Sequence, residues 1–306
     1  MRLKLGRPDI GQYADRFDVP AAAGGLGVTF LGVSSLLFDD GQSAFLTDGF
    51  FSRPPLAKVA VSRIAPDAKR IDATLLRARI GRLDVIVPVH THFDHGLDSA
   101  AIAARTGATL LGSESAAQIG RGGGLPDEQI VVAHSPCTQT FGSFTLTLVA
   151  SAHCPPDRYP GVISEPLVPP ARADAYRCGE AWSVVVEHAS GRTALVQGSA
   201  GYVPGALDEQ RAEIVYLGVG QLGLLDDDYV NAYWQHTVRA VGARRAVLIH
   251  WDDFFRPLDQ PLRALPYAGD DLDATMRRLD RLASRDGVTL HLPAVWQRED
   301  PWHGLG

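Results

Sequence analysis

The sequence has few cysteines, no cluster of basic residues and no long hydrophobic run near its start. Its three cysteines, Cys137, Cys154 and Cys178, include no C-x-x-C pair. An odd number of scattered cysteines argues against a disulfide framework and against a zinc site built from thiolates. This usage is typical of a reducing compartment, so we expect a cytoplasmic location.

Charge and hydropathy exclude two further classes of protein. The net charge is −6 and the lysines and arginines are dispersed, so no nucleic-acid partner is expected, because phosphate binding needs clustered cations. Residues 1–27 contain no apolar run long enough for a signal peptide or a membrane span, and we expect no transmembrane segment. The remaining composition, 45% hydrophobic and 21% charged, is ordinary for a globular protein.

Hydrophobic patterning predicts a layered α/β protein. Short apolar runs bounded by turn residues predict strands, and longer runs with one apolar face predict helices. Strands early in each half of the chain, with helices outside them, indicate sheets covered by helices. The predicted strands are 28–31, 35–38, 44–47, 85–89, 109–111, 130–133, 144–149, 183–187, 193–197, 214–217, 246–249 and 288–292, and the predicted helices are 71–80, 99–106, 228–241 and 271–284.

Some segments lack a regular pattern. Residues 1–27 are predicted as an irregular N-terminal arm, and residues 155–180 contain six prolines, which exclude a regular helix or a central strand. The glycine-rich stretch 120–124 is predicted as a flexible turn, because it lacks the lysine of a P-loop. No linker marks a domain boundary. We therefore expect a single domain over residues 28–306, with 155–180 as a proline-rich lid.

The strongest local signal is the run His90-Thr91-His92-Phe93-Asp94-His95, directly after the predicted strand 85–89. Residues two apart on a continuing strand point to the same side, so His90 and His92 face one way. Asp94 and His95 lie in the turn beyond and can address a neighbouring point. Imidazole and carboxylate together suit zinc, iron or manganese. The run therefore predicts parts of two adjacent metal sites.

Two isolated histidines also follow predicted strands. His153 comes shortly after 144–149, and His250 comes directly after 246–249. Either residue alone is more often a hydrogen-bonded structural histidine. However, the carboxyl ends of strands in layered α/β folds converge on one crevice, so both are candidates to complete the metal sites.

These residues together resemble the metallo-β-lactamase superfamily. His90, His92, Asp94 and His95 match its HxHxDH motif, and His153 and His250 fall where its later histidine ligands fall, so that the resemblance covers roughly residues 28–292. It implies an αββα sandwich, with two mixed sheets flanked by helices and two divalent metal ions at one edge. The ions would be zinc, with manganese or iron as alternatives.

The resemblance also divides the ligands. His90, His92 and His153 would hold the first ion, and Asp94, His95 and His250 the second. Asp48, directly after the strand 44–47, would hydrogen-bond the ligand loop without touching a metal; the alternative is a plain turn aspartate before glycine.

The sequence departs from the family at Ser199. Most hydrolases of the superfamily carry a Gly-Asp after the strand 193–197, and that aspartate bridges the metals, whereas this chain has Gly198-Ser199. The change removes one negative charge and resembles class B3 β-lactamases, which also have serine there. Asp252 or Asp253 is an alternative source of a carboxylate; the simpler interpretation of both is a solvated turn.

The pair His250-Trp251 with the following Phe254 resembles the branch that contains ascorbate-6-phosphate lactonase and N-acyl phosphatidylethanolamine phospholipase D. The expected function is therefore that of a dinuclear, lactonase-like hydrolase. A hydroxide between two metal ions would attack an ester, lactone or phosphodiester of a small-molecule or lipid-like, amphipathic substrate. Asp94 would orient the hydroxide and carry its proton. The alternatives are a class B3-like β-lactamase and a catalytically idle metal-binding protein of the same fold.

Substrate contacts are expected from the proline-rich segment and its surroundings. Tyr159, Tyr176 and Trp182 could form an apolar wall, and each could equally be a packing residue, which is the better interpretation for Trp182. The sequence does not predict the oligomeric state.

Overall fold

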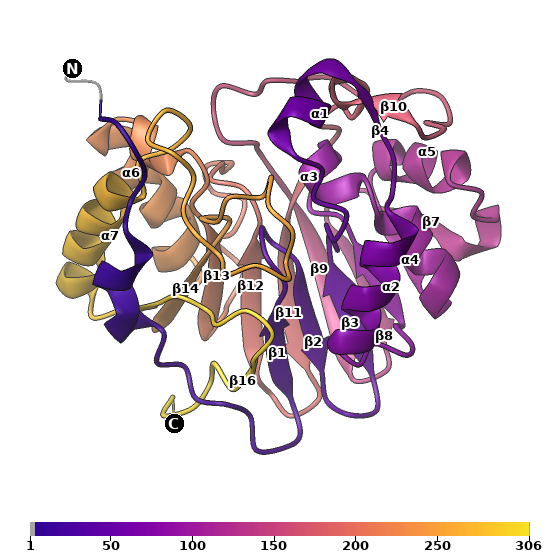
Figure 1. Ribbon diagram of the computed structural model, residues 1–306. Coiled ribbons are helices and arrows are strands. Elements are labelled where there is room, and N and C mark those ends of the chain that lie inside the picture. The colour runs from indigo at the N-terminus through magenta and orange to yellow at the C-terminus, as the bar shows by residue number, and fades with distance from the viewer. Residues whose placement is uncertain (1–3, 306) are drawn as a thin grey trace.

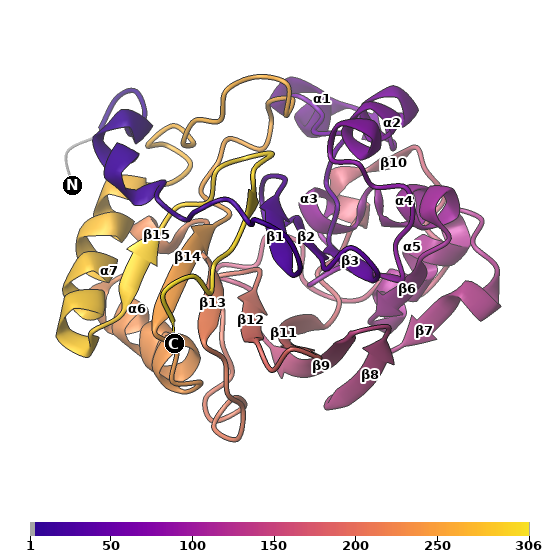
Figure 2. The same ribbon diagram turned by 90° about the horizontal axis from the view of Figure 1, so that it is seen from below.

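Two seven-stranded sheets face each other in the computed structural model, which describes residues 4–305 (Figures 1 and 2). Each sheet is mixed, because one part of its strands pairs antiparallel and the other part parallel. Helices cover the outer face of each sheet (Figure 2). The predicted αββα sandwich with two mixed sheets is therefore confirmed.

The first sheet has the order β16-β1-β2-β3-β5-β6-β7, and the second has the order β15-β14-β13-β12-β11-β9-β8. The first contains β1 (Gly27–Phe30), β2 (Leu36–Asp39), β3 (Ala44–Thr47), β5 (Val85–Val87), β6 (Thr109–Gly112), β7 (Ile130–Val132) and β16 (Arg298–Glu299). The second contains β8 (Cys137–Phe141), β9 (Phe144–Ser151), β11 (Ala181–His188), β12 (Thr193–Gln197), β13 (Ile214–Gly218), β14 (Arg245–Ile249) and β15 (Thr289–His291). A small separate pair joins β4 (Arg63–Ile64) to β10 (Ala171–Arg172).

The helices fall into two groups along the chain. The first half carries α1 (Leu56–Val61), α2 (Ala68–Arg77), α3 (Phe93–Gly96), α4 (Ser99–Thr106) and α5 (Glu114–Gly122), and the second half carries α6 (Asp227–Trp234) and α7 (Leu272–Asp286). Shorter 3-10 segments are η1 (Ile10–Arg16), η2 (Asp127–Gln129), η3 (Ala173–Ala175) and η4 (Leu222–Leu224), and a π-helical turn, η5 (Gln235–Arg239), extends α6. Within residues 4–305, no helix is both long and apolar enough to cross a membrane.

Local sequence explains where several helices begin and end. The side chain of Asp67 accepts hydrogen bonds from the first turn of α2, so this helix starts earlier than the predicted 71–80. Ser113 caps α5 in the same way, and the glycines predicted as a flexible turn at 120–124 form the end of that helix. Gly107 and Gly287 adopt the left-handed conformation after α4 and α7, as expected for helix C-termini.

Two hydrophobic cores stabilise the layers. Between the sheets, Phe45 on β3 stacks on Phe38 at 4.6 Å and meets Phe144 of β9 edge-on at 5.0 Å, so aromatic side chains join the two inner faces. Outside the first sheet, Leu46 belongs to a second core with Ile71 of α2. The buried strands therefore have apolar residues on both faces, which explains their continuous hydrophobic runs.

Of the predicted arm 1–27, residues 1–3 lie outside the described residues, and residues 4–27 are less irregular than predicted. Within the expected arm, η1 lies along α7 (Figure 1), where Tyr13 donates a 2.7 Å hydrogen bond to Asp273 and Arg16 pairs with Asp280 at 2.9 Å. These contacts fix the arm to the outer helix of the second sheet.

Candidate metal centre

The candidate residues lie at the carboxyl ends of five strands. Asp48 follows β3, the motif 90–95 follows β5, His153 follows β9, Ser199 follows β12 and His250 follows β14. The strands of both sheets deliver them to the same edge of the sandwich. The sheet topology thus brings together residues that are up to about two hundred positions apart in the sequence.

His90, His92 and His153 form one cluster. Their ring centroids are 4.6 to 4.9 Å apart, and one nitrogen from each ring lies within 4.8 Å of the others. His90 is 1% exposed, yet neither of its ring nitrogens has a hydrogen-bond partner among the described residues. Buried polar atoms without partners are uncommon, and three converging imidazoles are a typical ligand set for a divalent cation.

Asp94, His95 and His250 form a second cluster beside the first. The Nε2 atoms of His95 and His250 are 3.3 Å apart, and Oδ2 of Asp94 lies 3.7 and 3.5 Å from them, respectively. Two nitrogens bound tetrahedrally to one zinc ion at ~2.0–2.1 Å would be about 3.3 Å apart. The rings of His90 and His95 are 3.8 Å apart between centroids, so the two clusters adjoin.

Three of the histidines have one ring nitrogen already bonded to an oxygen. Nδ1 of His95 contacts Asp48 Oδ2 at 2.8 Å, and Nδ1 of His153 contacts the carbonyl of Cys154 at 2.7 Å. Nε2 of His92 contacts Asp157 Oδ1 at 3.1 Å. A nitrogen that donates to an acceptor carries the proton, so the other nitrogen of the same ring has its lone pair free for a metal.

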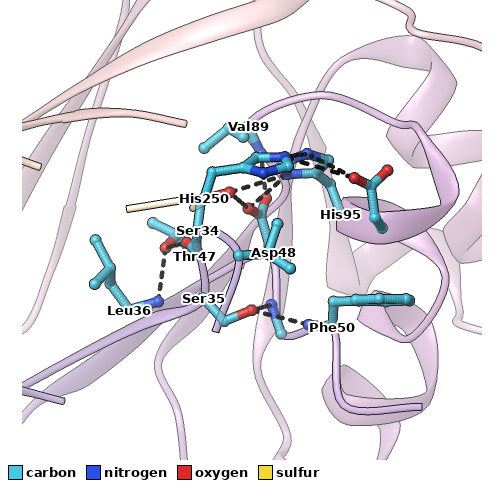
Figure 3. Close-up of polar contacts among 12 residues, drawn as sticks. Ser34, Ser35, Leu36, Thr47, Asp48, Phe50, Val89, His95 and His250 are labelled. Carbon is cyan, nitrogen blue, oxygen red and sulfur yellow. Dashed lines mark hydrogen bonds and ion pairs between the residues drawn. The ribbon is translucent and has the colours of Figure 1, made fainter. Parts of the chain in front are cut away.

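Asp48 is the centre of a buried hydrogen-bond network, shown in Figure 3. Besides His95, its carboxylate accepts hydrogen bonds from the Ser34 hydroxyl at 2.5 Å and from the Val89 amide at 2.8 Å. The last contact ties Asp48 to the residue that precedes the motif. Asp48 thus lies where the resemblance expects it, oriented toward a candidate ligand.

The turns that present Asp48 and His250 have unusual backbones. Both residues have positive φ, 54° for Asp48 and 60° for His250, a conformation that non-glycine residues adopt at a cost and mainly at functional sites. A Cβ atom on Gly220 would lie only 2.7 Å from His250 Nδ1. Gly220 therefore allows His250 to occupy its position, a role that no local sequence pattern indicates.

A buried ion pair is connected to His250 through the backbone of Val33. The His250 amide donates to the Val33 carbonyl at 2.6 Å, and the Val33 amide donates to Asp252 Oδ1 at 2.8 Å. Asp252 also pairs with Arg53, and both side chains are fully buried. The interpretation of Asp252 as a solvated turn residue is wrong, and so is the alternative that it supplies the missing metal ligand, because its carboxylate is used by Arg53 and Val33.

Ser199 and Asp253 both line a pocket that lies next to the two clusters. The Ser199 hydroxyl accepts a 3.0 Å hydrogen bond from the Cys154 amide, which ties the end of β12 to the segment carrying His153. The carboxylate of Asp253 pairs with Arg7 and Arg263, so this residue is not a free solvated aspartate either.

The electrostatics of the clusters suit cation binding. Burial, followed by the neighbouring histidines, lowers the pKa of His90 well below its ordinary value, and burial with His92 lowers the pKa of His153 to about 4. Burial disfavours the charged form of Asp94, but His95 and His250 outweigh it and keep the pKa of Asp94 below its usual range. The pKa of His92 is also lowered by burial, whereas at His95 burial is outweighed by Asp48 and Asp94, which raise the pKa of that ring. The three histidines of the first cluster therefore favour the neutral form that metal binding requires, and a cation at the second cluster would displace a proton from His95.

A pocket of about 790 Å³ opens over both clusters. His92, Asp94, His153 and His250 lie in its wall, together with Tyr159 from the proline-rich segment. Tyr176 does not reach it, because its side chain is 1% exposed and packs in the outer core, so of its two interpretations the structure supports the packing residue. Trp182 is buried in the core between the sheets, as its interpretation as a packing residue predicted.

Comparison with known proteins adds information about the fold alone. No protein-family profile matches the sequence, and no curated protein matches it. Solved structures do match: Igni18, a metallo hydrolase from Ignicoccus hospitalis, is 13% identical with a TM-score of 0.51, covering 90% of this chain and 96% of that one. YhfI from Bacillus subtilis, a metallo-β-lactamase fold protein, is 12% identical with a TM-score of 0.50, covering 88% and 96%.

A third similar structure has a different chemistry. CmlA, a diiron β-hydroxylase from Streptomyces venezuelae, is 13% identical with a TM-score of 0.56, over 91% of this chain and 54% of that one. The chain therefore has the metallo-β-lactamase fold, and the structures similar to it include both a metallo hydrolase and a diiron β-hydroxylase. The activity has to be argued from the site itself.

Proposed function

We propose that the protein is a metal-dependent hydrolase with a dinuclear site. His90, His92 and His153 would hold one divalent cation, and Asp94, His95 and His250 would hold the other. The observation that carries the proposal is the orientation of these side chains: buried imidazoles and the Asp94 carboxylate converge on two adjoining points, and in His92, His95 and His153 one ring nitrogen is already bonded to an oxygen. Bound cations would lower the pKa of a water and polarise the carbonyl or phosphoryl oxygen under attack.

The protein's own groups have separate tasks in this proposal. Asp94 is ionised and lies between His95 and His250 at the pocket wall, so it can orient the attacking water and accept its proton. Asp48 keeps the His95 ring in one orientation. Ser199 adds no charge, and its hydroxyl holds the segment of His153 in place.

The pocket supports an ester, lactone or phosphodiester of a small or amphipathic molecule as substrate. Leu56 and Val59 of α1 and Phe254 and Phe255 form apolar parts of its wall, where the hydrocarbon part of a substrate can be buried. Arg158 also lines the pocket, and within residues 4–305 it has no ion pair or hydrogen bond. A free guanidinium beside the clusters favours substrates that carry a negative charge.

The residues after His250 are the basis for proposing the branch that contains ascorbate-6-phosphate lactonase and N-acyl phosphatidylethanolamine phospholipase D. Phe254 meets the His250 ring edge-on at 5.7 Å and lines the pocket, whereas Trp251 is buried and faces Phe17. Of Trp251 and Phe254, the two aromatic residues that carry the resemblance, Phe254 is therefore the one that can contact substrate. Ser199 is the observation that favours the second candidate, a class B3-like β-lactamase.

Metal content tests the proposal first. Protein purified without added metal is analysed for zinc, manganese and iron, alongside His92→Ala and the control His303→Ala, which alters an exposed histidine far along the chain from the motif. We expect about two equivalents in the wild type and the control, and a large loss in His92→Ala. Zinc is the expected metal, with manganese or iron as alternatives.

Hydrolysis of a panel of substrates then separates the candidates. The panel contains lactones, aryl esters, phosphodiesters with and without an acyl chain, and a β-lactam. Turnover of an ester, lactone or phosphodiester that is lost in Asp94→Asn supports the proposal, and turnover of the β-lactam alone supports the second candidate. Two bound metals without any turnover would indicate an idle metal-binding protein, and no bound metal after incubation with zinc or manganese would refute the proposal.

A further inference from the structure

Asp157 belongs to the proline-rich segment and contacts a ligand of the first cluster. Its Oδ1 lies 3.1 Å from Nε2 of His92, and the carbonyl of Tyr159 lies 3.4 Å from the same nitrogen. The His92 side chain is 7% exposed and that of Asp157 is 26% exposed, so the pair is shielded from solvent on most sides. Two oxygens from one segment therefore face a single ring nitrogen.

The segment is hydrogen-bonded to the motif and to itself near this contact. The Thr91 amide donates to the Cys178 carbonyl at 2.9 Å, and the Cys178 amide donates to the Tyr159 carbonyl at 2.9 Å. The Gly179 amide donates to Gly161 at 2.9 Å. These bonds connect the beginning of the segment, its end and the residue between His90 and His92. The Tyr159 amide also donates to Asp157 Oδ1 at 3.0 Å, which holds Asp157 beside His92.

We infer that Asp157 is a positioning residue that holds His92 with its proton on Nε2 and leaves Nδ1 free to bind a cation. The inference rests on the proposed function, because it concerns a ligand of the proposed first site. His95 shows the same relationship with the two ring nitrogens exchanged: Asp48 contacts its Nδ1 and leaves Nε2 facing His250. Carboxylates that bond the outer nitrogen of a metal-binding histidine fix its tautomer and strengthen it as a ligand.

This role gives the proline-rich segment a function in addition to lining the pocket. The carboxylate of Asp157 adds negative charge beside the first cluster, in a chain that has serine at position 199. It acts through His92 and does not bridge two cations, so it does not replace the bridging aspartate of other family members. A change in the segment is therefore expected to alter metal affinity as well as substrate binding.

Metal affinity of Asp157→Asn tests the inference. Competition with a chelator measures zinc affinity in the wild type, in Asp157→Asn and in the control Asp174→Asn, which alters an aspartate of the same segment that also lines the pocket but pairs with Arg172. We expect an affinity loss of roughly 10–100-fold in Asp157→Asn and no change in Asp174→Asn. Unchanged affinity in Asp157→Asn would overturn the inference.

Imidazole NMR provides a readout that does not depend on bound metal. In metal-free wild type, long-range proton–nitrogen spectra should show His92 as the tautomer protonated on Nε2, and Asp157→Asn, which keeps an oxygen acceptor but loses the negative charge, should weaken this preference while the other histidine signals stay unchanged. A wild-type His92 protonated on Nδ1 would overturn the inference. Wild type that binds neither zinc nor manganese would refute the proposed function, whereas normal zinc binding in Asp157→Asn would refute only the role of Asp157.

The main competing arrangement has Asp157 as a direct ligand. His92, Asp157 and Cys178 each offer an atom within 4.8 Å of the others, so they could hold one ion directly through Nε2 of His92. In that case Cys178→Ser would weaken binding as much as Asp157→Asn, and the cobalt-substituted protein would show a thiolate-to-cobalt absorption band. That result would overturn the inference; Cys178→Ser with wild-type affinity and no such band would support it.

Discussion

Asp48 and His95 are joined by a 2.8 Å contact between Oδ2 and Nδ1, and both side chains are almost completely buried. They come from the ends of two neighbouring strands, β3 and β5, which pair in parallel. The contact fixes the tautomer of His95 and leaves its Nε2 facing His250 and Asp94. Asp48, at the end of β3, therefore orients His95, which follows β5. His95 in turn contacts His250, which follows β14 of the second sheet.

Replacing Asp48 should weaken the second metal site. In Asp48→Asn the amide can still accept from Val89, but it no longer offers a charged acceptor to His95. We expect metal affinity to fall by roughly 10–100-fold, with the loss concentrated in one of two equivalents. Chelator competition measures this, with Asp39→Asn at the end of β2 as the control. Equal affinity in wild type and Asp48→Asn would show that Asp48 acts only as a turn residue.

Gly220 offers a way to move His250 without removing it. The Cβ atom of Gly220→Ala would come within 2.7 Å of His250 Nδ1, so the ring must shift away from its position beside His95. We expect loss of about one of two bound metals and of most hydrolytic activity, with thermal stability near that of the wild type. Gly81→Ala is the matched control, because a Cβ there meets nothing within 4 Å. Full metal content in Gly220→Ala would contradict the prediction.

Removing either partner of the buried Arg53–Asp252 ion pair should destabilise the protein, because the other partner is then left buried and unpaired. Arg53→Met leaves a buried carboxylate without its cation and should destabilise the fold by about 3–5 kcal/mol. Asp252→Asn, which keeps an oxygen acceptor for the Val33 amide, leaves the guanidinium unpaired and should cost a similar amount. The double variant should lose less than the sum of the two single losses, which urea unfolding of all four proteins measures. Strict additivity would contradict this coupling.

Much of the fold and the outline of the site could be predicted from the sequence. Continuous apolar runs indicated buried strands, and the six candidate ligands follow strands that were predicted at nearly their observed bounds. Local patterns succeed here because burial on both faces of a strand has a clear hydrophobic signature. The arrangement of these strands in two facing sheets was predicted only from the resemblance of the motif to a known family.

Contacts between distant segments could not be predicted in this way. Asp252 follows His250 in a polar run typical of a turn, and only the tertiary structure brings it to Arg53, 199 positions away. Asp157 and Gly220 carry no local pattern that connects them to His92 or His250. The helix α5 is not predicted, because the glycines at 120–124 indicate a turn, and only the structure shows that Ser113 caps it. The sequence does not decide between packing and substrate contact for Tyr176, because a proline-rich segment gives no periodicity from which burial can be inferred.

Glu299 should make the free energy of unfolding depend on pH. This residue of β16 is 2% exposed, and burial raises the pKa of its carboxyl from the ordinary value of 4.5 to about 8. Between these two values the folded protein retains a proton that the unfolded chain has lost, so its contribution to stability is complete below about pH 4.5 and is lost as the pH rises through 8.

Glu299→Gln keeps an oxygen that can accept from the Ala294 amide but cannot ionise. Urea unfolding between pH 5 and about pH 9, with chelator in every sample, should therefore show a shallower decline for Glu299→Gln than for the wild type. Glu187→Gln, at an exposed position of β11, should follow the wild type. Parallel declines in wild type and Glu299→Gln would show that Glu299 is already ionised in the folded protein.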